Sequence, residues 1–219
     1  MVTNLGSLAV ATVLTVAFSG RPAAPTVRQG PASSGPMRIV VLGDSLAVSP
    51  SPEQGFPARL QQKLDEQSPG WKISNAGVRG DTTTGGRRRL APLLAADVRL
   101  LVVALGANDG LRGVRLATVE DNLSAIITAA QQRGIQVLLC GMETPPLHGW
   151  EYTVGFHELF PRLAARYDVP LVPFLLTGVA LARDMNLGDG VHPNAAGARV
   201  IADNVWPHLE PMLRPLTGV

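Results

Sequence analysis

A serine follows directly after a strand-like apolar segment near the start of the chain. The segment covers residues 38–42, and Gly43-Asp44-Ser45-Leu46 comes immediately after it. A continuous apolar run rich in Val and Ile is typical of a buried strand in a parallel sheet. Open α/β sheets bind ligands at the carboxyl ends of such strands. Ser45 is therefore a candidate nucleophile, although the same four residues taken alone would more often mark an ordinary turn.

An acid and an imidazole stand three residues apart near the C-terminus, as Asp189 and His192. Serine is a poor nucleophile at neutral pH and needs a base. His192 can accept the Ser45 proton and return it to the leaving group. Asp189 can accept a hydrogen bond from the other ring nitrogen, which fixes the tautomer and stabilises the imidazolium. Gly190 permits the backbone turn that this short spacing requires.

Two further segments follow predicted strands and carry groups that could donate hydrogen bonds. Asn108 follows the apolar strand 100–105, and Gly80 lies in the segment 75–82 after a predicted strand at 71–74. With the serine and Asp-x-x-His segments, in this order along the chain, they resemble the GDSL family of serine hydrolases, also called SGNH hydrolases. The bacterial branch of periplasmic esterases is the most similar. The resemblance covers about residues 38–212.

The resemblance implies a role for each matched residue. Ser45, His192 and Asp189 would form the catalytic triad. The backbone N–H groups of Ser45 and Gly80 and the side-chain amide of Asn108 would form the oxyanion hole. Further residues are expected to support the site or to contact the substrate: Asp44, Leu46, Asp109, Met142 and Glu143. For Asp44 two roles stay open, support of the nucleophile loop and capping of the turn that follows it.

The implied activity is that of a serine esterase. It would hydrolyse acyl or aryl carboxylic esters through an acyl-enzyme, with possible thioesterase and lysophospholipase activity. The apolar segment after Cys140 favours acyl or aromatic groups in the pocket; it contains Met142, Pro145, Pro146, Leu147 and Trp150. The alternative is a carbohydrate O-deacetylase of the same superfamily, and a third reading is a non-catalytic secreted binding domain. No cofactor is expected, and no metal, because no residues show metal-ligand spacing.

Strand-like and helix-like segments alternate from Met37 onward, which predicts a mostly parallel sheet covered on both faces. The resemblance makes this an α/β fold of three layers, α/β/α, that is flavodoxin-like with a five-stranded sheet. The sequence predicts helices over residues 53–66, 86–96, 118–134, 154–167 and 194–213. Thr118 can cap the third helix and Gly134 can end it. Residues 37–219 are expected to form one hydrolase domain.

The first 36 residues differ in composition from the rest. Residues 5–18 are apolar but too few to span a bilayer comfortably, which favours the core of a signal peptide. No Lys or Arg precedes them, which argues against it. Residues 20–36, rich in Pro, Ala, Ser and Gly, resemble a flexible linker. The prediction is a periplasmic or secreted protein without stable membrane insertion after processing.

The charge balance of the chain says little about macromolecular partners. Nineteen Lys and Arg against 17 Asp and Glu give a net charge of +2, too small to argue for nucleic acid. The triplet Arg87-Arg88-Arg89 is expected to be a solvated helix face, with contact to an anionic head group as the alternative. The expected partner is a small-molecule ester or thioester, and the resemblance suggests a monomer.

Overall fold

A five-stranded parallel sheet forms the centre of the molecule in a computed structural model, which describes Met1 and residues 37–213. All four strand pairings are parallel, and the strand order is β2-β1-β3-β4-β5. This is the order of flavodoxin-like folds. The predicted three-layer fold with its five-stranded sheet is confirmed. The strands are β1 (Met37–Gly43), β2 (Trp71–Gly77), β3 (Val98–Ala104), β4 (Gln136–Cys140) and β5 (Leu171–Val172).

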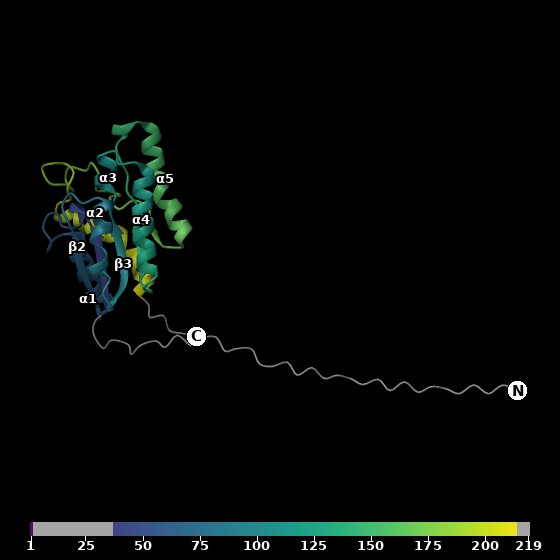
Figure 1. The fold of residues 1–219 in the computed structure, drawn as a ribbon. Coiled ribbons are helices and arrows are strands. Elements are labelled where there is room, and N and C mark those ends of the chain that lie inside the picture. The colour runs from purple at the N-terminus through teal and green to yellow at the C-terminus, as the bar shows by residue number, and fades with distance from the viewer. Residues whose placement is uncertain (2–36, 214–219) are drawn as a thin grey trace. The chain divides into compact units, whose positions relative to one another are not determined.

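Helices cover both faces of the sheet (Figure 1). On one face α1 (Phe56–Gln67) packs against α6 (Ala195–Leu209). On the other face α4 (Leu116–Gln131) packs between α2 (Thr83–Arg88) and α5 (Trp150–Tyr167). The central strands β1 and β3 are almost wholly buried between these layers, which explains why their sequences are continuously apolar.

The strand register aligns the carboxyl ends of β1, β2 and β3, the three strands nearest the predicted site. Gly43 at the end of β1 pairs with Gly77 of β2 on one side and with Ala104 of β3 on the other. The segments that follow these three strands therefore begin side by side at one edge of the sheet. The strand order changes direction between β1 and β3, and ligands bind at such switch points in open α/β sheets.

Three helices, α2, α4 and α5, begin before the positions predicted for them. The second was predicted over 86–96, but α2 begins at Thr83, because the Thr82 side chain accepts a hydrogen bond from the Gly85 N–H. A separate 3-10 turn at Ala91–Leu93 follows, since Pro92 cannot continue an α-helix. Thr118 does not cap α4: that helix begins at Leu116, and its N-cap, Arg115, makes no side-chain cap hydrogen bond.

The remaining helices differ from the predicted ranges mainly at their ends. α5 begins four residues before the predicted start, and a 3-10 turn at Pro146–His148 lies in the predicted loop. α1 begins at Phe56, with Pro57 in its first turn, where the missing N–H costs nothing. α6 ends at Leu209, and a 3-10 helix over Glu210–Leu213 replaces its predicted last turn. The five-residue α3 (Ala107–Leu111) was not predicted.

The described residues from Met37 to Leu213 belong to one compact unit. The predicted signal peptide and linker over residues 1–36 lie, apart from Met1, outside the described residues. In the described part of the chain, no helix is both long enough and apolar enough to cross a membrane.

Candidate active site

The predicted nucleophile lies in a tight turn at the carboxyl end of β1. Residues Ser45–Ala47 form a single 3-10 turn, and Ser45 retains 8% of its accessible surface. Asn75, at the end of β2, supports this turn from the neighbouring strand, because its side-chain amide donates to the Ala47 carbonyl over 2.9 Å. The serine is thus presented by a rigid element rather than by a long loop, as a positioned nucleophile requires.

Ser45, His192 and Asp189 lie in one hydrogen-bonded row. The distance from Ser45 Oγ to His192 Nε2 is 3.0 Å, and that from His192 Nδ1 to Asp189 Oδ2 is 2.7 Å. Ser45 and His192 are 147 residues apart in sequence. With Nδ1 donating to the carboxylate, Nε2 is free to accept the serine proton, which is the tautomer that base catalysis needs.

Asp189 is held as an anion by the backbone of its own loop. The N–H groups of His192 and Val191 each donate to Asp189 Oδ1 over 2.9 Å. These two bonds, followed by that from the His192 ring, hold the pKa of Asp189 well below its ordinary value. Gly190 has a φ of +70°, so the glycine provides the turn that the Asp-x-x-His spacing was predicted to need.

Asp44 has both of the roles that the sequence left open. Its Oδ1 accepts the Leu46 N–H over 2.9 Å and so caps the nucleophile turn, while its Oδ2 accepts the Asn108 side-chain amide over 3.2 Å. Asp44 is fully buried, and this desolvation raises its pKa to about 6. An ionised carboxylate only accepts hydrogen bonds, so it selects the orientation in which Asn108 presents its NH₂ group.

Gly80 occupies a turn after β2, the strand that pairs with β1. The Asp81 N–H donates to the Val78 carbonyl over 3.1 Å, and Gly80 has a φ of +72°, as position i+2 of a type II turn requires. In the described part of the chain, the backbone N–H groups of Ser45 and Gly80 are not used in other hydrogen bonds of the protein. Together with one N–H of Asn108, they could stabilise an oxyanion.

Two of the supporting residues lie beneath the site, away from the space open to substrate. Asp109 is fully buried, and its two oxygens accept the backbone N–H and the hydroxyl of Thr83 over 2.8 and 2.7 Å. Burial raises its pKa. Leu46 is 4% exposed and packs in the hydrophobic core. Both residues therefore join the site segments to the fold and do not line the substrate space.

The segment after β4 is divided between buried and exposed residues. Met142 is 2% exposed and belongs to the core, so it does not lie on the open side of the segment. Glu143 pairs with His157 of α5 over 2.6 Å. Leu147 and Trp150 remain exposed, at 66% and 74% of their surfaces. The apolar surface predicted for this segment is therefore carried by its later residues.

An arginine that the sequence analysis assigned to a solvated helix face joins the two loops of the site. Arg87 and Arg88 are exposed, but Arg89 is only partly so, and it bonds to Asp81 and to the carbonyls of Ala76 and Gly43. Residue type and spacing alone could not separate Arg89 from its two neighbours. In the structure, Arg89 comes three residues after Gly86, which is buried against the sheet.

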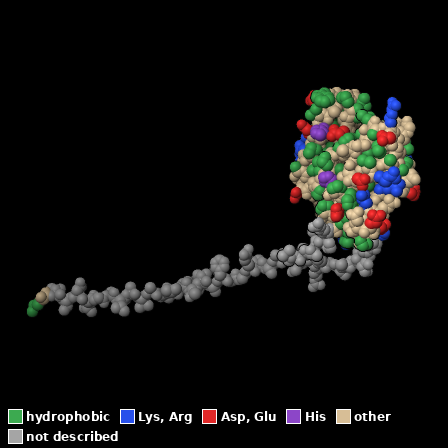
Figure 2. All heavy atoms as spheres, turned by 180° about the vertical axis from the view of Figure 1, so that it is seen from behind, with side chains coloured by type: hydrophobic (Ala, Val, Ile, Leu, Met, Phe, Trp, Pro, Cys, Tyr) green, Lys and Arg blue, Asp and Glu red, His purple; other side chains and the backbone are tan. Residues whose placement is uncertain are grey.

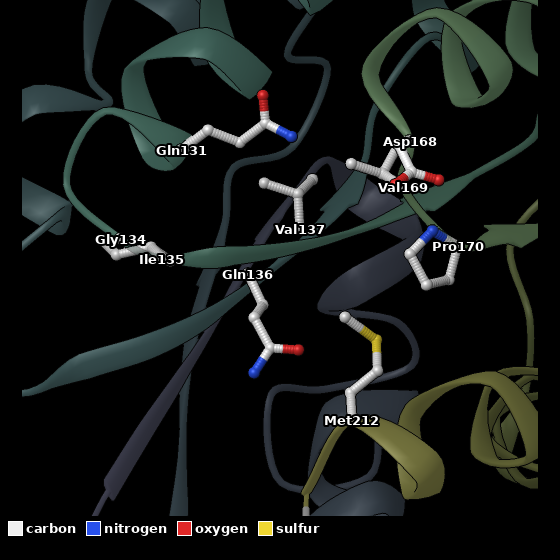
Figure 3. Close-up of a pocket in the computed structure, with 9 residues that line it drawn as sticks. All are labelled: Gln131, Gly134, Ile135, Gln136, Val137, Asp168, Val169, Pro170 and Met212. Carbon is white, nitrogen blue, oxygen red and sulfur yellow. The ribbon is translucent and has the colours of Figure 1, made fainter. Parts of the chain in front are cut away.

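A cavity of about 370 Å³ lies away from these residues. Its lining residues lie where β4 begins, at the opposite edge of the sheet, and include Gln136, Asp168 and Met212 (Figure 3). None of the predicted site residues lines it.

No group of three or more His, Cys, Asp or Glu side chains within the described ranges could hold a metal ion. The one cysteine of the chain, Cys140, is buried, which raises its pKa to about 12.

Comparison with known proteins agrees with the fold and identifies the family. The model of the GDSL-like Lipase/Acylhydrolase family matches residues 41–200. Esterase TesA of Pseudomonas aeruginosa is 39% identical over 178 residues, which cover 80% of this chain and 89% of that protein. Thioesterase 1/protease 1/lysophospholipase L1 of Escherichia coli is 34% identical, with 80% and 84% covered.

A solved structure has the same fold over the same part of the chain. A crystal structure of TesA, 38% identical, superposes with a TM-score of 0.76 and covers 80% of this chain and 99% of that one. The family match extends from within β1 to within α6 and so includes all the segments that carry the predicted site residues. This protein belongs to the GDSL-like lipase/acylhydrolase family.

Proposed function

We propose that this protein is a serine esterase that hydrolyses carboxylic esters of acyl or aryl type through an acyl-enzyme on Ser45. The observation that carries the proposal is the continuous row from Ser45 Oγ through the His192 ring to Asp189, with distances of 3.0 and 2.7 Å. Family membership and the esterase and lysophospholipase relatives support the same reaction class. Thioesters and lysophospholipids are proposed as further substrates.

In the first half of the reaction, Ser45 Oγ attacks the carbonyl carbon of the ester while its proton passes to His192 Nε2. The carbonyl oxygen becomes an oxyanion that accepts hydrogen bonds from the Ser45 N–H, the Gly80 N–H and the Asn108 amide. Asp189 stabilises the imidazolium that forms and does not itself take the proton. Collapse of the tetrahedral intermediate breaks the bond to the alcohol, which leaves with the proton from His192.

In the second half, water attacks the acyl-enzyme. His192 accepts a proton from this water, and a second tetrahedral intermediate forms with its oxyanion on the same donors. Collapse releases the carboxylic acid, and the proton returns to Ser45. The depressed pKa of Asp189 keeps this carboxylate ionised throughout the neutral range, so it can support the imidazolium in both halves.

The surface around the site favours an apolar acyl or aryl group. Three of the exposed large hydrophobic residues lie next to proposed site residues in sequence: Val78 is two residues before Gly80, Leu111 is three after Asn108, and Val191 directly precedes His192. In Figure 2 hydrophobic side chains gather at the upper end of the molecule, where α5 begins in Figure 1. This surface fits an acyl chain better than it fits an acetylated sugar.

The place of action is proposed on the sequence alone. The apolar run over residues 5–18 followed by a linker-like segment supports secretion to the periplasm or the medium. A monomer that acts on small ester substrates is the simplest form of the proposal. Hydrolysis needs no residue beyond those that one chain brings together at the end of β1.

The test is hydrolysis of p-nitrophenyl esters from acetate to palmitate by the wild type, Ser45→Ala and Ser49→Ala. Ser49 is a matched control, because its hydroxyl is buried close to the same turn without a hydrogen-bond partner in the described chain. We expect activity on short or medium chains, loss of at least about 10³-fold in S45A, and near wild-type turnover in S49A. Full activity in S45A would refute the proposal, and turnover of acetate alone would favour the carbohydrate deacetylase.

A further inference from the structure

The two backbone donors of the oxyanion hole lie on separate loops. Ser45 follows β1, and Gly80 lies in the turn after β2. A backbone N–H has no side chain through which its direction can be adjusted, so each donor points where its loop points. A misplacement of about 1 Å in such a group can cost about 100-fold in rate. Some contact must therefore hold the two loops at a constant separation.

Arg89 makes that contact. At the C-terminal end of α2, its Nη2 donates to the Gly43 carbonyl over 2.9 Å and its Nη1 to the Ala76 carbonyl over 2.6 Å. Its Nε donates to Asp81 Oδ2 over 2.7 Å. Gly43 lies two residues before Ser45, and Asp81 follows Gly80 directly. One planar group thus bonds to the supports of both donors, and it does so from three different nitrogens.

The surroundings make this contact stiff. The Arg89 side chain retains 25% of its exposure and that of Asp81 only 11%. The Gly43 carbonyl also accepts the Val78 N–H over 3.1 Å, and Asp81 Oδ1 accepts the Thr82 N–H over 3.0 Å. Each end of the contact is therefore fixed by a second hydrogen bond. Lysine could not replace it, because an ammonium is a compact charge without the planar fork of a guanidinium.

We infer that Arg89 is a positioning residue for catalysis, which holds the Ser45 and Gly80 N–H groups at the separation that the oxyanion requires. The catalytic part of the inference rests on the proposed esterase function. The structural part, that Arg89 holds the Gly80 turn in place, does not depend on that function. A competing account is that Arg89 stabilises the oxyanion only by its positive charge. The two accounts differ in what a lysine at this position should do.

The experiment compares Arg89→Met and Arg89→Lys with a matched control, Arg38→Met. Arg38 bonds to Asp97 at the opposite end of the same strand β1, with both side chains nearly 40% exposed, so its loss perturbs β1 without touching the site. The first readout is kcat and KM for p-nitrophenyl butyrate. The second is the amide resonance of Gly80 in protein labelled with ¹⁵N-glycine, assigned by its absence in Gly80→Ala.

We expect both Arg89 variants to lower kcat by about 10- to 100-fold with KM within about threefold of wild type. In both, the Gly80 resonance should move, and R38M should show neither change. Wild-type kcat in R89K would overturn the inference in favour of a pure charge effect. An equal loss in R38M, or an unmoved Gly80 resonance, would also overturn it. If R89M does not fold, R89K retains the charge and aliphatic stem and decides the same question.

The two readouts distinguish failure of the proposed esterase function from failure of the inference about Arg89. A folded wild type that hydrolyses no ester would refute the esterase, and the Gly80 resonance would still decide whether Arg89 sets the geometry of this turn. Movement of the resonance in R89M and R89K but not in R38M supports the inference under either result.

Discussion

At the scale of single residues, Asp44 shows how a buried charge serves two ends of a site. Its two oxygens accept from Leu46 and from Asn108, so one side chain connects the nucleophile turn to the amide donor after β3. These bonds do not offset the loss of water completely, because the pKa stays raised at about 6. The residue that organises the site therefore lowers the stability of the fold at neutral pH.

This cost predicts a measurable pH dependence. The folded protein holds the Asp44 proton up to about pH 6, whereas the unfolded chain releases it near its ordinary value of 3.8. The contribution of Asp44 to the unfolding free energy is thus fully present below pH 4 and is lost as the pH rises through 6. Between pH 4 and 7.5 the wild type should lose up to about 3 kcal/mol more unfolding free energy than Asp44→Asn. Urea unfolding of both proteins at several pH values measures this difference. An unfolding free energy that changes equally with pH in the wild type and in D44N would contradict the prediction.

At the scale of elements, the start of α6 holds the loop that carries His192. Asn194 caps the helix, since its Oδ1 accepts the N–H groups of Ala196 and Gly197 over 2.8 and 3.1 Å. Its Nδ2 donates backwards to the carbonyls of Asp184 and Asn186 over 2.8 and 3.2 Å. The same side chain thus caps the helix and holds the loop that precedes His192, the proposed catalytic base.

The two functions of Asn194 can be separated by substitution. Asn194→Asp keeps the cap oxygen but loses the amide donor, whereas Asn194→Ala loses both. We expect N194A to lower the unfolding free energy by about 2 kcal/mol and N194D by about 1 kcal/mol. Chemical denaturation measures the difference, and equal losses in both variants would show that the cap contributes nothing here.

At the scale of the whole molecule, the two edges of the sheet carry different features. The amino edge of the sheet carries ion pairs such as Arg38–Asp97 and a cavity without site residues. The carboxyl edge carries the proposed triad and the proposed oxyanion donors. Separation of this kind lets the site segments vary while the sheet and its helices keep their contacts.

This organisation predicts that the compact unit does not need the first 36 residues. β1 begins at Met37, whose N–H donates to the Gly70 carbonyl over 3.0 Å, so the sheet is complete from this residue onward. A chain that begins at Met37 should unfold within about 0.5 kcal/mol of the full chain and have the same kcat. A larger loss of stability would mean that the leading segment contributes to the folded unit.

Features that depend on local order could be predicted from the residues alone. The apolar run of β1 and the alternation of strands and helices follow from residue type and short-range periodicity, and they predicted a mostly parallel sheet covered on both faces. The family resemblance added the three layers and the five strands, and the Asp-x-x-His spacing predicted the turn at Gly190. Within the helix predicted over 118–134, the apolar residues recur at helical spacing and are buried: Leu123, Ile126, Ile127 and Ala130. Helix starts were less predictable, because caps such as Thr82 compete with other polar residues nearby.

Features that depend on contacts between distant parts of the chain could be found only in the folded structure. Arg89 differs from Arg87 and Arg88 because it meets the Gly43 carbonyl, 46 residues away. The raised pKa of Asp44 needs the burial that only the packed site provides, and Glu143 is occupied by His157 from another element. Burial and partner choice depend on which segments the sheet brings together, and no local pattern records that.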